Sequence, residues 1–557
     1  MSYYEQYRER IERAIQANRE RTYYAPFPEN PKSYPEDAAA WALSRFQACL
    51  NNDFTELLQE KPLRFEGEEI SPYLQTGLGI RYPIFADKLL VQTASKALDI
   101  WRKVSFNERA GILAACLDRM KERFFDIAYA TQHTTGQSFM MAFQAGGPHA
   151  ADRAMEVIAM GMEELRRVPE SCVWDKPMGK FNITLQKTWK AMPRGVALVI
   201  GCSTFPTWNT LPGVFASLIT GNSVIIKPHP KAVLPIAIVV AEMQKVFNEA
   251  GITPDVIQLA PDTLAFPLAW ELAGHPDVRI IDYTGNTSFG NQLEGLQQTG
   301  KQVFTEKAGV NPVIIDSVTD IKAVCDNLAF SLSLYAGQMC TAPQNFFVSH
   351  QGIRTPEGMV SVDDFMELFT AALNNISGHP KMAPGVLAAL QQDAQKDRIA
   401  SVAAEFSDAV VLPSSSFANE EFPDARVATP LLLKVDASRT EAYDREWFGP
   451  IGVVICTPST DESLRRVLDL SRRHGAISCG IYCTDPERVA DMADQLARIF
   501  VPVSVNLTGP IYLNQHAAFS DFHVTGGNPA GNASFTDALY LNRRFVWVGQ
   551  RFASSSL

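Results

Sequence analysis

Four short apolar runs decide the fold: GVALVIG at 195–201, NSVIIKP at 222–228, VIQLA at 256–260 and RIIDYTG at 279–285. Each run ends in, or is followed by, glycine, proline or polar residues, and the segments between the runs are long enough for a helix. Strands that alternate with helices form a parallel sheet that helices cover on both faces. The sequence therefore predicts a doubly wound α/β domain, whose ligands bind beyond the carboxyl ends of the strands.

A second series of strands and helices follows. We expect it to start at KQVFTEKAG, 301–309, and to include the apolar runs at 311–316, 344–349, 451–456 and 478–483. This series predicts a second α/β domain.

A strand outside both domains is indicated at 181–189, where apolar and polar residues alternate at the period of a half-exposed strand. The tail at 543–552 is also strand-like, and we expect it to pair with this strand or with another subunit. The predicted layout is an N-terminal helical extension at 1–85, a first α/β domain at 86–171 and 195–304, a second at 305–534, and a β arm at 172–194 and 535–557.

Composition limits the class of protein. A chain of 557 residues with 46% hydrophobic and 20% charged residues is typical of a soluble protein of two to four domains. The net charge of -11 argues against nucleic acid and anionic membranes as partners. Nine cysteines without a CxxC pair and nine histidines without HExxH predict neither a disulfide framework nor a metal site. The charged N-terminal stretch does not resemble a signal peptide, so we expect a cytoplasmic protein.

Two residues of the second series are candidates for chemistry. Cys340 lies in AGQMCTAPQNFFV, 336–348, between a predicted helix and a predicted strand. A lone cysteine is usually a small buried hydrophobe, but a loop position lets backbone amides stabilise a thiolate and an oxyanion. Glu306 precedes Cys340 by 34 residues. It is either a solvated surface residue or, if buried near Cys340, an acceptor for the proton of a thiol or a water.

Three more candidates follow strands of the first series. Asn209, in GCSTFPTWNTLPG, starts a helix and is either an N-cap or a second donor to an oxyanion. Lys227 ends the second strand, where a parallel sheet holds a nucleotide ribose, although strand-end lysines are mostly solvated. Gly285 and Gly290 surround a helix start that suits a pyrophosphate. No GxGxxG follows the first strand.

Taken together and in this order, these motifs resemble the aldehyde dehydrogenase superfamily from about Phe85 to the C-terminus. REWFGPIG, 445–452, adds to the resemblance, since Glu446 and Phe448 match the segment that holds the nicotinamide ribose and ring. The resemblance implies a dinucleotide-binding first domain, a catalytic second domain and an oligomerisation arm. The protein is then expected to form a homodimer or a dimer of dimers.

The resemblance also implies a mechanism. Cys340 attacks the aldehyde carbon, and the Asn209 amide and the Cys340 backbone N–H hold the oxyanion. A hydride passes to the nicotinamide, and a water activated by Glu306 hydrolyses the thioester to a carboxylic acid.

Three departures from the family pattern bear on specificity. Pro230 stands where many NAD-using members carry a glutamate, so repulsion against a 2′-phosphate is lost, while Lys227 and His229 can attract one. This predicts a preference for NADP over NAD. Asn286 replaces the usual serine after Gly285 and can still donate to phosphate. HVTGGNPAGNAS, 523–534, replaces the usual Gly-Gly-Lys-x-Ser-Gly segment and leaves the substrate mouth undefined.

The long N-terminal extension, TGGNPAGNAS and FPTWN resemble the phenylacetic acid degradation (PaaN-type) subgroup. This implies a substrate carried on coenzyme A, 3-oxo-5,6-dehydrosuberyl-CoA semialdehyde, or another semialdehyde from aromatic ring cleavage. A basic patch for coenzyme A is available in Arg472, Arg473, Arg543 and Arg544, which are otherwise solvated or interface residues.

Two other functions remain open. One is an esterase or thioesterase that uses Cys340 and Glu306 and has a vestigial cofactor site. The other is a catalytically silent oligomer that acts as a scaffold. Lys227, Glu446 and Phe448 argue against the first. Retention of Cys340, Glu306 and Asn209 argues against the second.

Overall fold

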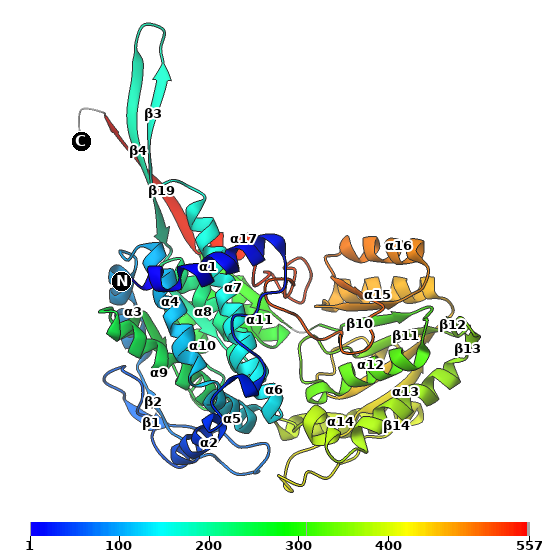
Figure 1. The fold of residues 1–557 in the computed structure, drawn as a ribbon. Helices are drawn as coiled ribbons and strands as arrows, with labels where there is room; N and C mark the ends of the chain where they lie inside the picture. The colour runs from blue at the N-terminus through cyan, green and yellow to red at the C-terminus, as the bar shows by residue number, and fades with distance from the viewer. Residues whose placement is uncertain (1, 308, 554–557) are drawn as a thin grey trace.

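The first sheet lies in one of two α/β lobes of the computed structural model, which describes residues 2–307 and 309–553 (Figure 1). Its five parallel strands have the order β7-β6-β5-β8-β9. They are β5 (Val196–Ile200), β6 (Ser223–Lys227), β7 (Ile257–Leu259), β8 (Val278–Thr284) and β9 (Gln302–Glu306).

Both faces of this sheet are covered. Val199 and Ile226 pack in the core beside α7 (Ala150–Arg166), α8 (Pro206–Ile219) and α9 (Leu234–Glu249). Leu198 and Ile225 pack on the other face against α3 (Asp87–Trp101) and α10 (Ala269–Gly274). Neighbouring residues of one strand thus point into two apolar layers, which explains the continuous apolar runs and confirms the predicted doubly wound sheet. The lobe also contains α4 (Phe106–Lys121), α5 (Phe124–Thr135), α6 (Phe139–Gln144), α11 (Thr287–Gly295) and α17 (Ala538–Asn542).

The second sheet has seven strands in the order β14-β15-β16-β11-β10-β17-β18, parallel except for the β14 and β15 pair. The strands are β10 (Pro312–Ile315), β11 (Asn345–Ser349), β14 (Val410–Leu412), β15 (Leu431–Asp436), β16 (Ile451–Thr457), β17 (Cys479–Tyr482) and β18 (Val503–Val505). Its helices are α12 (Ile321–Ser333), α13 (Val362–Ser377), α14 (Asp393–Glu405), α15 (Thr460–His474) and α16 (Pro486–Ala497), and a small hairpin is formed by β12 (Ile353–Thr355) and β13 (Gly358–Val360).

The sequence pattern led us to assign one strand to the wrong sheet. KQVFTEKAG was expected to begin the second series, but its strand, β9, hydrogen-bonds β8 and is an edge strand of the first sheet. Glu306 is therefore the last residue of the first sheet, at the point where the chain leaves for the second lobe.

The arm is a separate three-stranded antiparallel sheet that projects from the first lobe (Figure 1). It consists of β3 (Ser171–Pro177), β4 (Asn182–Pro193) and β19 (Phe545–Ala553), with β4 in the middle. The predicted pairing of the C-terminal tail with the strand at 181–189 is confirmed. Apolar side chains on the arm are exposed, including Val173, Phe181, Val546 and Val548.

The N-terminal segment belongs to the first lobe. Its helix α1 (Tyr3–Glu20) lies across α4 and α7 and adds Ile11, Ala14 and Ile15 to the core (Figure 1). The segment is not wholly helical as predicted, since α2 (Ala38–Cys49) is followed by an antiparallel pair of β1 (Arg64–Glu66) and β2 (Tyr82–Ile84). None of the described helices combines the length and the apolar character that crossing a membrane requires.

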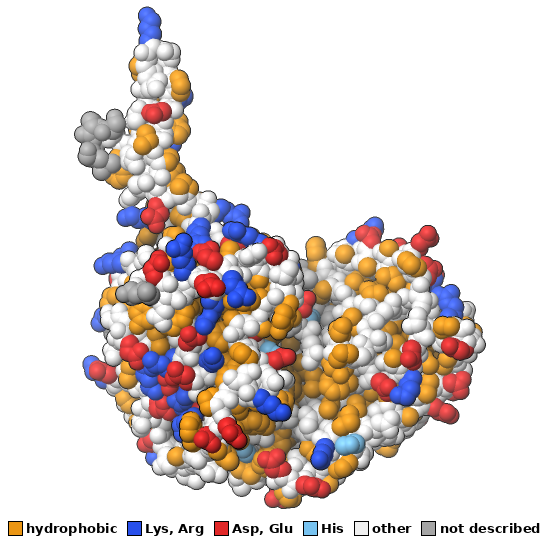
Figure 2. Space-filling model, viewed as in Figure 1, with side chains coloured by type: hydrophobic (Ala, Val, Ile, Leu, Met, Phe, Trp, Pro, Cys, Tyr) orange, Lys and Arg blue, Asp and Glu red, His pale blue; other side chains and the backbone are white. Residues whose placement is uncertain are grey.

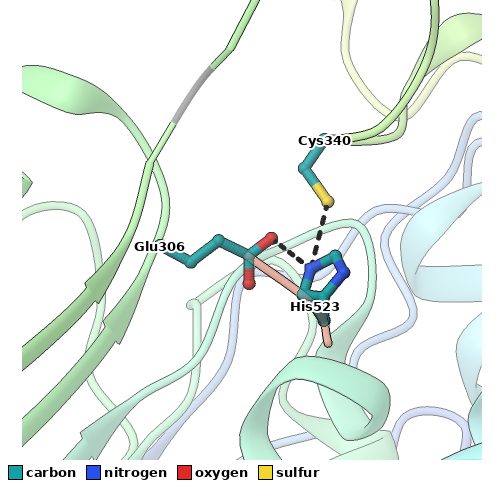
Figure 3. A group of neighbouring side chains, drawn as sticks. All are labelled: Glu306, Cys340 and His523. Atoms are coloured by element: carbon teal, nitrogen blue, oxygen red, sulfur yellow. Dashed lines mark hydrogen bonds and ion pairs between the residues drawn. The ribbon is translucent and has the colours of Figure 1, made fainter. Parts of the chain in front are cut away.

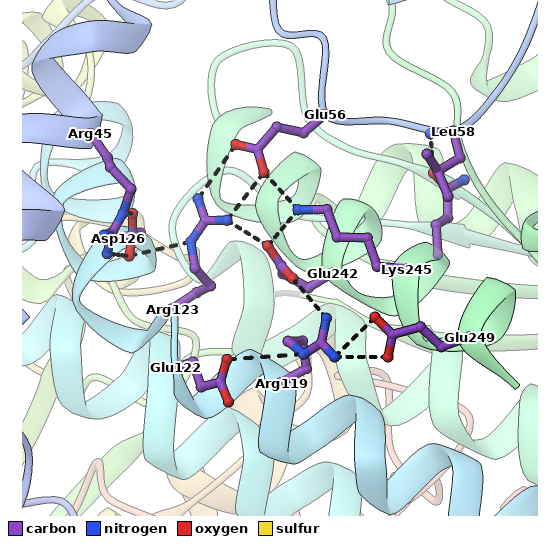
Figure 4. Close-up of polar contacts among 11 residues, drawn as sticks. Arg45, Glu56, Leu58, Arg119, Glu122, Arg123, Asp126, Glu242, Lys245 and Glu249 are labelled. Atoms are coloured by element: carbon purple, nitrogen blue, oxygen red, sulfur yellow. Dashed lines mark hydrogen bonds and ion pairs between the residues drawn. The ribbon is translucent and has the colours of Figure 1, made fainter.

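An ionic network fixes this segment to the helices beneath it (Figure 4). Glu56 accepts hydrogen bonds from Arg123 at 3.1 Å and from Lys245 at 3.0 Å. Glu242 of α9 accepts from the same two cations. Two acidic and two basic side chains from three parts of the chain thus form ion pairs with one another. Several contacts therefore hold the loop after α2 in place.

Arg544 is not available to a ligand, contrary to the predicted basic patch. Its side chain is fully buried, and its two terminal nitrogens donate to the two carboxylate oxygens of Asp282 at 2.8 and 2.6 Å. Arg472 and Arg473 stand at the end of α15 and pair with Asp469 and Asp444. The predicted patch of four arginines therefore does not form, because Arg544 is buried and cannot take part.

Replacing Arg544 by methionine is expected to lower the free energy of unfolding by about 3–5 kcal/mol, because Asp282 is left buried without its counter-charge. Urea denaturation measures this. Arg472→Met, which removes an ion pair between exposed side chains, is the matched control and should change stability little. Equal losses from the two substitutions would contradict a structural role for Arg544.

Candidate active site

Glu306 ends β9 with its carboxylate wholly buried. A segment from the far end of the chain closes over it, since Lys307 donates its backbone N–H to the Ala530 carbonyl and Asn532 donates to the Thr305 carbonyl at 3.1 Å. Gly531 lies so close to this strand end that a Cβ there would be 2.6 Å from the Thr305 oxygen. This contact is what brings the 523–534 segment to Glu306.

Asn209 lies in the first turn of α8, three residues inside the helix, and is not the N-cap that one interpretation of the sequence expected. Its amide Nδ2 donates to Glu306 Oε2 at 2.8 Å. The predicted second donor and the predicted acceptor of a proton are therefore direct neighbours.

Cys340 occupies a strained loop between the two lobes. Tyr335 and Ala336 precede it with positive φ angles of 52° and 47°, a conformation that side chains rarely adopt. Asn311, which the sequence did not single out, donates to the Cys340 carbonyl at 2.7 Å. The loop is thus held from the segment that follows Glu306.

His523 completes the group and was also missed by the sequence (Figure 3). Its Nε2 is 2.9 Å from Glu306 Oε1 and 3.8 Å from Cys340 Sγ. The three functional atoms of Cys340, Glu306 and His523 lie within 4.8 Å of one another. His523 begins the atypical HVTGGNPAGNAS segment, so the departure from the family pattern was the signal that could have found it.

The two central groups have opposite pKa shifts. Burial raises the pKa of Glu306, but the charge and hydrogen bond of His523 with further hydrogen bonds from Cys340 and Asn209 outweigh it, so the net pKa is lowered. Burial and the nearby Glu306 charge raise the pKa of the Cys340 thiol well above its usual range. The resting group is therefore a thiol beside a carboxylate, and not the amide-stabilised thiolate that the sequence suggested.

The adenosine end of the expected coenzyme site contains an acid that the sequence did not indicate. Lys227 Nζ is 2.7 Å from Asp262 Oδ1, and both side chains are buried. Burial, with the charges of Lys227 and Lys231, lowers the pKa of His229 to about 3, so this imidazole is neutral. Pro230 follows it in the same turn.

The other predicted coenzyme residues lie at helix and loop ends. Gly285 and Asn286 precede α11, and Asn286 Oδ1 caps this helix by accepting from Phe289 N, which leaves the amide NH₂ as a donor. Burial raises the pKa of Glu446 to about 7, with Arg398 lowering it. The Phe448 carbonyl accepts from Arg398 at 2.7 Å.

These residues fit a nicotinamide dinucleotide. The half-buried Glu446 carboxyl would be stabilised in its ionised form by a ribose hydroxyl, and it is near enough to Cys340 to raise the pKa of the thiol. The Asn286 amide and the start of α11 suit a phosphate. Figure 2 shows a hollow between the two lobes on this face of the molecule.

The structure thus brings a thiol, a buried carboxylate and an amide donor together between two doubly wound lobes. Residues 87–528 match the model of the aldehyde dehydrogenase family. The chain belongs to this family, which confirms the predicted fold and class of enzyme, an NAD(P)-dependent oxidoreductase of aldehydes.

Individual relatives agree with this assignment. A solved structure of an NAD-dependent aldehyde dehydrogenase from Burkholderia multivorans is 42% identical, with a TM-score of 0.96 over 99% of both chains. Benzaldehyde dehydrogenase [NAD(+)] of Pseudomonas putida is 23% identical over 81% of this chain and 87% of its own. Vanillin dehydrogenase of an Amycolatopsis species is 24% identical over 87% and 94%.

Replacing Glu306 by glutamine is expected to speed alkylation of Cys340 at neutral pH. The Glu306 charge raises the pKa of the thiol, so its removal lowers that pKa and increases the thiolate fraction, by about tenfold for each pKa unit. Iodoacetamide labelling of the Cys340 peptide, followed by mass spectrometry, measures the rate. Glu294→Gln, a nearby carboxylate without this effect, is the control; unchanged or slower labelling in Glu306→Gln would contradict the account.

Proposed function

We propose that the protein oxidises an aldehyde to a carboxylic acid through a thioester on Cys340. The observation that carries the proposal is the contact group of Cys340, Glu306 and Asn209. Glu306 takes the thiol proton, and the sulfur attacks the aldehyde carbon as the S–H bond breaks. The Asn209 amide then turns from the carboxylate to the oxyanion.

The second half of the reaction uses the same carboxylate. A nicotinamide coenzyme, held by Lys227, Asn286, Glu446 and Phe448, supplies a hydride acceptor when bound. Once the thioester has formed, Glu306 releases the thiol proton to solvent and is a carboxylate again. It then takes a proton from a water that attacks the thioester and passes this proton to the departing sulfur, so Cys340 returns as a thiol and Glu306 as a carboxylate. The carboxylic acid is the product.

For the coenzyme we propose NAD, in place of the NADP preference that Pro230 suggested. The predicted preference for NADP assumed that Lys227 and His229 attract the 2′-phosphate as cations. Asp262 now balances the charge of Lys227, and His229 is neutral. A carboxylate at this position accepts hydrogen bonds from ribose hydroxyls and repels a 2′-phosphate.

For the substrate we propose an aldehyde from aromatic catabolism. The benzaldehyde and vanillin dehydrogenases among the relatives support this class. The CoA-linked semialdehyde of phenylacetate degradation is the narrower proposal, but its expected arginine patch does not form, because Arg544 is buried. The exposed apolar side chains of the arm support a homodimer or dimer of dimers, which sedimentation measures.

Purified protein should reduce NAD in the presence of benzaldehyde, vanillin or a CoA-linked semialdehyde, followed by absorbance of the reduced coenzyme. Cys340→Ala should lose at least about 1000-fold in kcat because the nucleophile is gone, while coenzyme binding by fluorescence stays unchanged. Cys325→Ala, at another buried cysteine, is the control. No reduction with any aldehyde would overturn the proposal, and ester hydrolysis without reduction would favour the esterase.

Asp262→Asn should raise the ratio of kcat/KM for NADP to that for NAD by roughly tenfold, because the repulsion of the 2′-phosphate is removed. The matched control is Asp255→Asn, since Asp255 lies at the opposite end of β7. A ratio that does not change would rule out Asp262 as the selecting residue.

A further inference from the structure

His523 is the member of the site that the proposed reaction does not yet use. Its ring is 2% exposed and lies between Trp208, edge-on at 4.7 Å, and Phe535, stacked at 6.1 Å. Its two nitrogens both have partners, Glu306 and Cys340 at Nε2 and His516 Nδ1 at 2.9 Å from Nδ1.

The partners determine where the protons lie. Glu306 is ionised, so its Oε1 only accepts, and the His523 Nε2 at 2.9 Å must carry the hydrogen. Burial lowers the pKa of His516 well below its usual range, so His516 is neutral and shares one hydrogen with His523 Nδ1. Either direction of that bond leaves the Nε2–H on Glu306. His523 therefore donates to the carboxylate and does not take the thiol proton.

The hydrogen bond from His523 to Glu306 becomes more important during the reaction. In the resting site Glu306 has one strong donor on each oxygen, His523 on Oε1 and Asn209 on Oε2. Once the Asn209 amide turns to the oxyanion, His523 is the remaining close donor, with the Thr284 hydroxyl at 3.5 Å. A fully buried carboxylate that loses its donors becomes protonated and stops acting as a base.

We propose that His523 is a positioning residue that holds the Glu306 carboxylate directed at Cys340 and ionised before each of the two proton transfers. The inference rests on the proposed function and adds a residue outside the family's motifs. The chain holds this ring at a cost, because Val524, a β-branched residue, follows it at φ 63°. The other titratable and charged groups that face this site are Cys340, Cys202 and His516, with Glu446 beyond Cys340 and Arg153 beyond His516.

His523→Phe fills the same volume without a donor, and His523→Gln restores an amide N–H. The first should raise the pKa of Glu306, since the hydrogen bond from His523 to its Oε1 is lost. Two readouts follow: the infrared band of the protonated Glu306 carboxyl, identified by its absence in Glu306→Gln, and the acid limb of the kcat profile. Both should move to higher pH in His523→Phe and return toward the parent in His523→Gln.

Phe535→Leu loosens the packing of the ring but keeps the donor, so it is the matched control and should leave the carboxyl titration in place. If His523→Phe does not fold, His523→Asn, whose amide is too short to reach Oε1, replaces it. An unmoved titration in these variants, or an equal shift in Phe535→Leu, overturns the proposal. The infrared titration needs no aldehyde, so it decides the role of His523 even if the proposed oxidation fails.

Discussion

The site depends on keeping one buried carboxylate charged. Glu306 is fully buried, and burial alone would raise its pKa. His523 and Asn209 supply the hydrogen bonds that reverse this effect. The same charge suppresses ionisation of Cys340, so the thiol is unreactive until its proton moves to Glu306. The carboxylate and the thiol that the proposed mechanism uses as base and nucleophile are therefore controlled by a single electrostatic balance.

The fold builds this balance from distant parts of the chain. β9 carries Glu306 to the edge of the first lobe, and the segment around Gly531 pairs with the strand end and brings His523 with it. The N-terminal segment supports the other side, since Arg21 lies over the Phe522 ring at 4.0 Å and Tyr24 packs against Phe519 at 5.2 Å. Arg21 and Tyr24 of the N-terminal segment thus pack against the loop that positions His523.

Local pattern was enough to predict two α/β sheets, although it assigned β9 to the wrong one, and to single out three of the side chains that meet in the candidate site. Strands buried on both faces appear in the sequence as apolar runs. Glu306 ends such a strand, Asn209 lies in the helix that follows another, and Cys340 lies in the loop before a third. His523 could not be placed this way, because 217 residues separate it from Glu306 and no periodicity shows which distant loops meet. The prediction that Arg544 belongs to a basic patch was wrong for the same reason, since its burial depends on Asp282, 262 residues away. Asp262 could have been found from the sequence, because it follows the VIQLA run after a single proline.

The most direct test of the account is to trap the intermediate on Cys340. Glu306→Gln is incubated with benzaldehyde and NAD, digested at low pH and analysed by mass spectrometry. The account predicts an acyl group on the Cys340 peptide that persists in this variant and turns over in the parent. An acyl group on another residue, or none on Cys340 while reduced coenzyme is formed, would contradict it.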